Sequence, residues 1–341
     1  MHRTAPDIQV ARPDVAPPPS GLGGLMVIEA GPETAAAPAA ASKRRCVTSL
    51  TVAIPARNEE ANIGPLLVEL RRVLAPLQAD GLDVEIVVVD DGSTDGTPTI
   101  AAAHGATVVT HADSLGNGAA VKRGIRTAAR DWILLLDGDG QHPPADIPAM
   151  LALAERYDMV VGSRDGCGGA WHRNVANRIY NGLASYVTGR RIPDLTSGFR
   201  LVRADALKSF VYLLPNTFSY PTTITLAMLR AGYSVAFHPI AVRPRRGKSH
   251  IRLLADGSRF LMIILRIATF FAPLRVFGPV AALVFATGVC WYAFTYFAYG
   301  RFTNMAVMLM VQATMIFGLG LVSEQIAALR QDRASERSDR R

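Results

Sequence analysis

The chain has 341 residues and a formal net charge of +8, so its partners are expected to be anionic: phosphates, acidic lipid head groups or nucleic acid. Nucleic acid is excluded as the expected partner, because the sequence contains no recognised nucleic-acid-binding module and many of its cations flank apolar segments. The three cysteines, Cys46, Cys167 and Cys290, lie far apart and show neither metal-ligand spacing nor the pattern of a disulfide framework. This favours a reducing compartment.

The N-terminal segment, residues 1–45, is rich in Ala, Pro and Gly and shows no sustained hydrophobic period. This composition predicts a disordered tail. The short apolar patch 22–28 does not have the form of a signal peptide, because Asp7 and Asp14 precede it and Glu29 follows it.

Residues 46–245 have the pattern of one α/β domain. Near-continuous apolar runs separated by helical stretches are typical of a parallel sheet that helices cover on both faces. The clearest runs are Thr48–Pro55, Val84–Val89, Trp132–Leu136 and Met159–Ser163. Open sheets of this kind bind their ligands beyond the carboxyl ends of the strands. Polar residues directly after these runs are therefore candidates for a binding site.

The third run ends in Asp137-Gly138-Asp139-Gly140-Gln141, which places two carboxylates and an amide at alternate positions. Such hard oxygen ligands, left partly open, suit Mg²⁺ or Mn²⁺ shared with a substrate diphosphate. A solvated acidic turn or a helix cap is the alternative. Asp90 and Asp91 follow the second run and Arg164 ends the fourth, and this recurrence of charged groups at strand ends favours a ligand-binding cleft.

Two uncharged stretches near the C-terminus, Leu274–Gly300 after Arg275 and Phe302–Val322, are each long enough to cross a bilayer core of ~30 Å. We expect two transmembrane helices within residues 274–328, with a buried hairpin of a soluble domain as the alternative. Residues 246–273 are expected to hold an acceptor loop and amphipathic interfacial helices. A third span within 253–271 is the alternative there.

Basic residues lie on one side of the predicted spans, because the turn between them has only Arg301. The flanking cations are Arg245, Arg246, Lys248, Arg252, Arg259, Arg266 and Arg275 before the spans and Arg330, Arg333, Arg337, Arg340 and Arg341 after them. The positive-inside rule therefore places the α/β domain, both termini and the charged tail 329–341 in the cytoplasm. Aromatic residues near the turn are typical of a membrane interface; they are Tyr292, Tyr296, Phe297 and Tyr299.

Four motifs occur in a fixed order: Pro55-Ala56-Arg57-Asn58-Glu59, Val89-Asp90-Asp91-Gly92-Ser93, Asp137-Gly138-Asp139-Gly140-Gln141 and Thr196-Ser197-Gly198-Phe199-Arg200. In this order, over roughly residues 48–330, the chain resembles family 2 glycosyltransferases, and among them the polyprenyl-phosphate sugar transferases related to dolichyl-phosphate mannose synthase and bactoprenol glucosyltransferases. The resemblance implies a GT-A fold and an inverting, metal-dependent hexosyltransferase of the cytoplasmic membrane. It also implies a nucleotide diphosphate sugar as donor, polyprenyl (undecaprenyl) phosphate as acceptor and membrane lipids as partners, and it leaves homo-oligomer formation open.

The resemblance also implies roles for single residues. Metal ligation is implied for Asp137, Asp139 and Gln141, and catalysis for Asp137, Asp139 and Arg164. Nucleotide-sugar binding is implied for Pro55, Arg57, Glu59, Asp90, Asp91, Ser93, Lys122, Asp137 and Gly138. Candidate cations for the acceptor phosphate are Arg164, Arg173, Arg178, Arg200, Arg245, Arg246, Lys248 and His250, each with a solvated surface cation as the alternative. Relatives commonly have Ser-Lys where this chain has Ser249-His250. Lys248 is therefore expected to contact the acceptor phosphate in place of that lysine.

Three classes of function fit these motifs. A polyprenyl phosphate presents an oxygen that is already anionic, so no protein base is needed and Asp194→Asn is expected to be tolerated. A hydroxyl acceptor on a glycolipid or polysaccharide would need a base, for which Asp194 is the candidate. A non-catalytic membrane scaffold would need no metal ligands. Processive polysaccharide synthases carry a Gln-x-x-Arg-Trp segment and more spans, neither of which this sequence has.

Overall fold

The computed structural model describes residues 46–164, 171–216, 219–243, 272–301 and 303–339, together with residues 262, 265, 268 and 269. Two of the predictions lie wholly or largely outside these residues: the N-terminal tail 1–45, and the acceptor loop and amphipathic segment 246–273. Cys167 also lies outside them. The α/β domain and the two apolar helices lie almost entirely within them.

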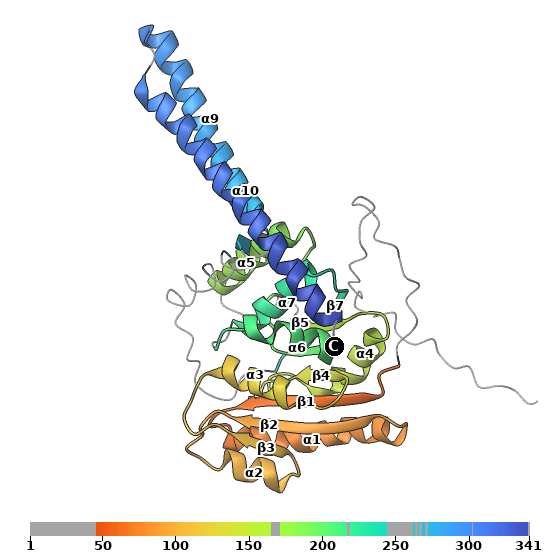
Figure 1. Cartoon of the computed structure of the whole chain (residues 1–341). Helices are drawn as coiled ribbons and strands as arrows, with labels where there is room; N and C mark the ends of the chain where they lie inside the picture. The colour runs from red at the N-terminus through yellow and green to blue at the C-terminus, as the bar shows by residue number, and fades with distance from the viewer. Residues whose placement is uncertain are drawn as a thin grey trace, which may run out of the picture.

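A seven-stranded sheet forms the centre of the N-terminal domain (Figure 1). The strands are β1 (Ser49–Ala56), β2 (Asp83–Asp90), β3 (Thr107–Thr110), β4 (Trp132–Leu135), β5 (Met159–Arg164), β6 (Arg200–Arg203) and β7 (Val235–Ile240). Their order is β3-β2-β1-β4-β6-β5-β7; β6 is antiparallel to β4 and β5, and the other pairings in this sheet are parallel. The four predicted strands are confirmed. The antiparallel β6 has only two apolar residues between its arginines, which is too short a run to predict a strand.

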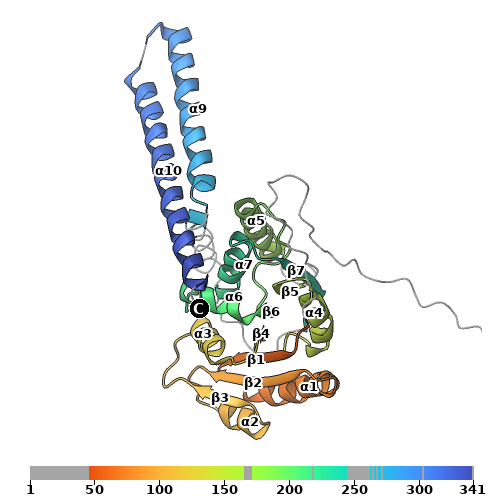
Figure 2. The same cartoon turned by 45° about the vertical axis from the view of Figure 1, so that its right-hand side comes forward.

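Helices cover both faces of the sheet, as its apolar strands require (Figure 2). Met150 of α4 shares a core with Leu134 of β4, whereas Ile125 of α3 shares the opposite core with Ile133. Neighbouring strand residues belong to different cores because successive side chains point to opposite faces. The helices are α1 (Glu60–Ala79), α2 (Thr97–Ala103), α3 (Asn117–Thr127), α4 (Ile147–Ala154), α5 (Trp171–Thr188), α6 (Ala204–Phe210) and α7 (Tyr220–Arg230), with short 3-10 turns at η1 (Pro144–Asp146) and η2 (Val211–Leu213).

Arg200, at the start of β6, has the largest fully buried side chain among the described residues. Its guanidinium donates hydrogen bonds to the carbonyls of Ser197 (2.7 Å), Pro221 (2.7 Å) and Leu195 (3.3 Å) and to Thr225 Oγ1 (2.8 Å). A charge is tolerated in a protein interior only where such groups surround it. Burial lowers the pKa of Arg200 to about 10, so the side chain stays protonated at neutral pH. This cation ties the loop before β6 to the first turns of α7.

Two long helices, α9 (Leu274–Tyr299) and α10 (Asn304–Asp339), form an antiparallel hairpin that projects from the domain (Figures 1 and 2). Both are long and apolar enough to cross a membrane, and only 11% and 17% of their apolar windows are buried. Leu283 and Phe297 are 69% and 85% exposed. This exposure excludes the alternative of a buried hairpin in a soluble domain. The charged residues after 329 continue α10 as helix through Asp339.

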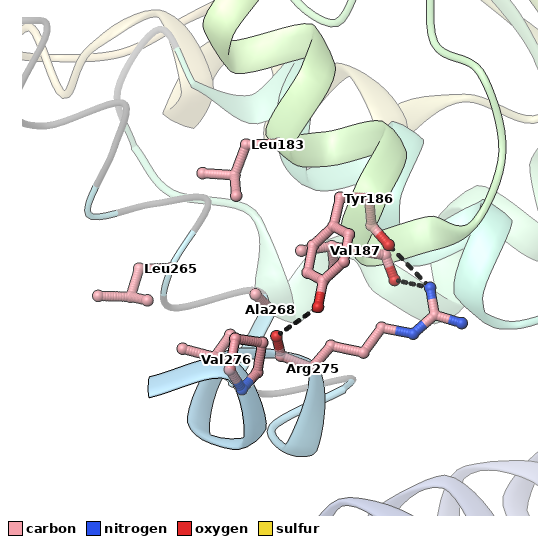
Figure 3. Close-up of a pocket in the computed structure, with 8 residues that line it drawn as sticks. Leu183, Tyr186, Val187, Leu265, Ala268, Arg275 and Val276 are labelled. Carbon is pink, nitrogen blue, oxygen red and sulfur yellow. Dashed lines mark hydrogen bonds between the residues drawn. The ribbon is translucent and has the colours of Figure 1, made fainter. Parts of the chain in front are cut away.

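The first turn of α9 is fixed to the last turn of α5 (Figure 3). Arg275 donates to the carbonyls of Tyr186 (2.8 Å) and Val187 (2.9 Å), where a cation is favoured by the helix dipole, and the Tyr186 hydroxyl donates to the Arg275 carbonyl (3.2 Å). Glu324 of α10 accepts the amide hydrogen of Leu274 (3.0 Å). A pocket of about 410 Å³ lies at this junction; it is lined by Leu183, Tyr186, Val187, Leu265, Ala268, Arg275, Val276 and Pro279.

The contact between α9 and α10 depends on a close approach at Gly320. A Cβ atom at Gly320 would lie 2.7 Å from Cβ of Phe277, whereas a Cβ at Gly318 would meet no atom within 4 Å. We therefore expect Gly320→Ala to lower the stability of the hairpin by about 1–3 kcal/mol through overpacking. Gly318→Ala is the matched control and should not destabilise it. Thermal unfolding in detergent measures both, and equal melting temperatures would contradict this packing.

Arg200→Met tests the buried cation, because methionine replaces the long side chain and removes every donor. Each buried carbonyl that loses its donor costs about 1–3 kcal/mol, so we expect a large fall in the free energy of unfolding. Arg191→Met, at an exposed arginine before β6, is the control and should change it little. Denaturant unfolding followed by circular dichroism compares the two. Similar midpoints would mean that the Arg200 network adds no stability.

Candidate active site

The carboxyl ends of β2, β1 and β4 meet at one edge of the sheet, because these strands are parallel neighbours. Main-chain hydrogen bonds continue beyond the strands: the Asp91 amide donates to the Ala56 carbonyl (2.9 Å), and the Gly138 amide donates to the Pro55 carbonyl (3.2 Å). The motifs that begin at Pro55, Val89 and Asp137 therefore lie side by side. This is the edge at which an open sheet binds its ligands.

The loops after β1 and β2 are joined through Asn58. Its backbone lies in the left-handed region (φ 54°), which asparagine tolerates better than most residues. The Asn58 amide donates to Ser93 Oγ (2.9 Å), and the Thr94 amide donates to Asn58 Oδ1 (2.9 Å). Ser93 thus helps to hold this edge together. Arg57 is exposed there, and Glu59 accepts a hydrogen bond from Asn62 (2.7 Å).

Asp90 and Asp91 are both buried but have different surroundings. Asp90 Oδ1 accepts the Ser93 amide (3.2 Å), while Oδ2 has no hydrogen-bond partner within the part of the chain that the structure covers. Asp91 accepts four bonds of 2.8–2.9 Å, from His111, Ser114 and the amides of Leu115 and Gly116. Burial alone would raise the pKa of Asp91, but these donors outweigh it and lower the pKa below 3.8.

The structure therefore gives Asp91 a different task from the one implied by the motif. Both of its oxygens hold the loop 111–116, so they are not open to a nucleotide sugar. Asp90 keeps an oxygen that can accept a donor from a ligand. Lys122, one turn into α3 after this loop, donates to Asn216 Oδ1.

Asp137 and Asp139 follow β4 and are both partly buried. Asp137 Oδ1 accepts a hydrogen bond from the Tyr220 hydroxyl (3.4 Å). Asp139 Oδ1 accepts one from the backbone N–H of Gln141 (3.1 Å). No group of three or more His, Cys, Asp or Glu side chains placed to hold a metal occurs among the residues described. The two carboxylates and the side-chain amide oxygen of Gln141 are nevertheless a set of oxygen ligands that fits Mg²⁺ or Mn²⁺ when a diphosphate supplies further oxygens.

Arg164 ends β5 and forms a two-point ion pair with Asp194. Its Nε lies 2.8 Å from Oδ2 and its Nη2 lies 3.0 Å from Oδ1. The Arg164 side chain is 40% exposed and that of Asp194 only 8%. Burial alone would raise the pKa of Asp194, but the hydrogen bonds and charge of Arg164 outweigh it and lower the pKa below 3.8. Asp194 is therefore an ionised carboxylate that fixes the plane of a partly exposed guanidinium.

Among the other predicted phosphate-binding cations, the structure describes the side chains of Arg178 and Arg200. Arg200 is fully buried and bonded to carbonyls, so this arrangement gives no support to phosphate binding by it. Arg178 is exposed on α5, and the side chain of Arg173 lies outside the described residues. Arg245, Arg246, Lys248 and His250 also lie outside them. The segment that carries those four follows Arg243 in the sequence, and the Arg243 amide donates to the Gln141 carbonyl (2.9 Å).

Two residues of the site have no local signal in the sequence. Tyr220 contacts Asp137 from the start of α7, which is 83 positions away, and Asn216 contacts Lys122 from 94 positions away. Neither follows a predicted strand. For Asp194 the sequence does offer a signal, because this residue lies two positions before the Thr196–Arg200 motif. Its Oδ1 accepts a hydrogen bond from the Thr196 backbone amide (3.0 Å).

Comparison with known proteins agrees with this geometry. Residues 51–210 match the family described as Glycosyl transferase family 2, and residues 272–329 match the GtrB C-terminal hairpin. The chain is 28% identical to the undecaprenyl-phosphate 4-deoxy-4-formamido-L-arabinose transferase of Edwardsiella ictaluri, over 84% of this chain and 91% of that protein. It is also 28% identical to glycosyltransferase AglJ of Haloferax volcanii, over 83% of this chain and 95% of that protein.

A solved structure has a similar fold. Glucosyl-3-phosphoglycerate synthase from Mycobacterium tuberculosis, in complex with Mn²⁺, uridine diphosphate and glucosyl-3-phosphoglycerate, gives a TM-score of 0.53 at 25% identity and covers 64% of this chain and 80% of that one. The family and fold expected from the sequence motifs are thereby confirmed. The chain contains a Glycosyl transferase family 2 domain with a GT-A-like fold in residues 51–210, followed by a GtrB C-terminal hairpin in residues 272–329.

Proposed function

We propose that this enzyme transfers a sugar from a nucleoside diphosphate sugar to a polyprenyl phosphate at a membrane surface. Relatives from Edwardsiella ictaluri and Aeromonas hydrophila are named as undecaprenyl-phosphate sugar transferases. The observation that carries the proposal is the Arg164–Asp194 pair. The carboxylate that a hydroxyl acceptor would need as a base is engaged, with a lowered pKa, in orienting a cation. A cation without a base suits an acceptor that is already an anion.

The donor nucleotide is assigned to the edge formed by β1 and β2. Asp90 Oδ2 would accept a hydrogen bond from a donor group of the nucleotide, since this oxygen is buried without a partner. Pro55 and Gly138, whose main chains are joined by a hydrogen bond, would form the floor of the nucleotide site. The remaining residues proposed at this edge are Arg57, Glu59, Ser93 and Lys122.

A divalent cation, Mg²⁺ or Mn²⁺, would be held by Asp137, Asp139 and Gln141. When bound, it supplies Lewis-acid stabilisation of the departing diphosphate. Support comes from the oxygen chemistry of these side chains and from the Mn²⁺ named in the complexes of the structural relative. The part of Asp137 and Asp139 that is exposed would face the donor.

The reaction joins a phosphate oxygen of the acceptor to the anomeric carbon of the sugar and breaks the bond from that carbon to the diphosphate. The nucleoside diphosphate leaves, and attack from the opposite face inverts the configuration. The acceptor oxygen is ionised near neutral pH, so no proton has to be removed. The main obstacle is the approach of two anions, and the oriented guanidinium of Arg164 reduces it.

The acceptor would reach the site from the junction of domain and hairpin. Apolar side chains line the pocket at that junction, which suits an isoprenoid chain (Figure 3). The acceptor phosphate would then meet Arg164 and the loop that carries Arg245, Arg246, Lys248 and His250. Arg243 anchors the start of that loop, because its guanidinium bonds both carboxylate oxygens of Glu69 at 2.7 Å.

The proposed orientation places the GT-A domain and both termini in the cytoplasm. The distribution of Lys and Arg around the two spans supports it. Tyr296, Phe297 and Tyr299, more than half exposed near the turn of the hairpin, would then lie at the opposite interface. An interfacial helix before α9 and self-association of the enzyme both stay predictions.

Asp139→Asn tests the cation site. An amide is a much weaker ligand for a hard cation, and Lewis-acid stabilisation is worth several kcal/mol, so we expect transfer to fall by roughly 100-fold or more. Asp80→Asn, at an exposed carboxylate after α1, is the control and should be fully active. Transfer of labelled sugar to undecaprenyl phosphate is measured with and without EDTA. Normal turnover by the Asp139 variant, or activity that survives EDTA, would exclude the metal role.

The Arg164–Asp194 pair revises the expectation that Asp194→Asn is tolerated. The substitution removes the charge that orients Arg164, so transfer should fall although no base is lost. Arg164→Ala should raise the barrier by about 2–4 kcal/mol, and the double variant should be little worse than Arg164→Ala alone, because both substitutions remove one interaction. Asp205→Asn, an exposed partner of Arg203, is the control.

The measurement for this pair is a double-mutant cycle on kcat/KM, with thermal unfolding recorded for each variant. If the losses in kcat/KM are additive, with Asp194→Asn inactive and Arg164→Ala active, the result would instead favour a hydroxyl acceptor with Asp194 as its base.

A further inference from the structure

Tyr220 is the first residue of α7 and contacts the candidate active site at Asp137. Its side chain belongs to the core formed with Ile224 and Leu195, and only 2% of the residue is exposed. The hydroxyl group nevertheless faces a carboxylate, because it donates to Asp137 Oδ1 at 3.4 Å. A buried tyrosine hydroxyl needs a polar partner, and here that partner is a proposed metal ligand.

Gly198 borders the other oxygen of the same carboxylate. A Cβ atom at Gly198 would lie 2.3 Å from Asp137 Oδ2, 3.0 Å from Asp137 Cγ and 3.1 Å from the Tyr220 hydroxyl. Carbon and oxygen atoms that are not bonded do not approach this closely. Asp137 can therefore occupy its observed position only because residue 198 has no side chain.

Arg200 holds these two neighbours of Asp137 in fixed relation. It donates to the Ser197 carbonyl, next to Gly198, and to the Pro221 carbonyl, next to Tyr220. The loop and the helix therefore present one surface to the carboxylate, although 22 positions separate Gly198 from Tyr220. A metal ligand supported in this way is held in one rotamer before the metal binds.

We propose that Tyr220 is a positioning residue that sets the orientation of Asp137 for the divalent cation, with Gly198 providing the space that this orientation needs. The inference rests on the proposed metal role of Asp137 and Asp139. The hydrogen bond from the Tyr220 hydroxyl to Oδ1 restricts rotation of the carboxylate, which keeps it in the orientation proposed to ligate the cation. The alternative is a core tyrosine whose hydroxyl only satisfies its own hydrogen bond.

Tyr220→Phe distinguishes the positioning role from that of a core tyrosine, because it keeps the ring in the core and removes the hydroxyl. Binding of Mn²⁺ to the purified full-length protein is titrated by electron paramagnetic resonance in the presence of UDP and, in parallel, of GDP. We expect Mn²⁺ affinity to fall 10–100-fold, as is usual when a group that orients a metal ligand is lost. Saturating Mn²⁺ should restore most of the transfer rate. Tyr212→Phe, at an exposed tyrosine, should bind Mn²⁺ as the wild type does.

Gly198→Ala provides a second test that does not depend on the tyrosine. The added methyl group must displace Asp137, so Mn²⁺ affinity should fall at least as far as in Tyr220→Phe. Gly182→Ala, at an exposed helical position with no atom within 4 Å of the new Cβ, is the control and should bind Mn²⁺ normally.

The outcomes distinguish this inference from the proposed function. Wild-type affinity for Mn²⁺ in a folded Tyr220→Phe variant, or in Gly198→Ala if the tyrosine variant does not fold, overturns the positioning role and leaves the metal site intact. Failure of the wild type itself to bind Mn²⁺ with either nucleotide overturns the metal site and the positioning role together.

Discussion

The buried guanidinium of Arg200 connects the segments on which the active site depends. Its hydrogen bonds join the loop before β6 to the first turns of α7. That loop carries Asp194, which orients Arg164, and Gly198, which borders Asp137. Because a buried charge would be very costly without these partners, the segments cannot separate without a large loss of free energy. These contacts link the residues around the site without any substrate, and preorganised groups of this kind are what electrostatic catalysis requires.

The carboxylates around this site fall into two groups that the protein treats differently. Asp91 and Asp194 are surrounded by donors, which lower the pKa of each, and they hold a loop and a guanidinium in place. Asp90 instead has a buried oxygen that lacks a partner among the described residues, while Asp137 and Asp139 are only partly buried. The presence of an Asp in one of these motifs therefore does not show whether it binds a ligand or holds the protein together. The number of donors that the fold directs at each carboxylate decides it.

The hairpin and the segment that carries Asp194 are both hydrogen-bonded to one helix, α5. At its C-terminal end the carbonyls of Tyr186 and Val187 accept Arg275 of the hairpin. Five residues before Tyr186, Asn181 donates to the Pro193 carbonyl (2.5 Å) and accepts the Leu195 amide (3.2 Å), on either side of Asp194. A short chain of hydrogen bonds therefore connects the start of the first span to the residue that orients Arg164. This arrangement fixes the site relative to the proposed membrane surface, where a lipid-linked acceptor would be presented.

The sequence by itself determined the parallel core of the sheet, the apolar hairpin and the strand-end motifs, because hydrophobic period, segment length and acidic residues after a strand are local properties. It also identified the family. Only the tertiary structure decided how these residues divide their work: Asp91 is closed by the loop 111–116, Arg200 is buried, and Asp194 is paired with Arg164. Tyr220 reaches Asp137 across 83 positions, and no local pattern records such a contact, because burial and partners depend on segments that meet only when the chain folds.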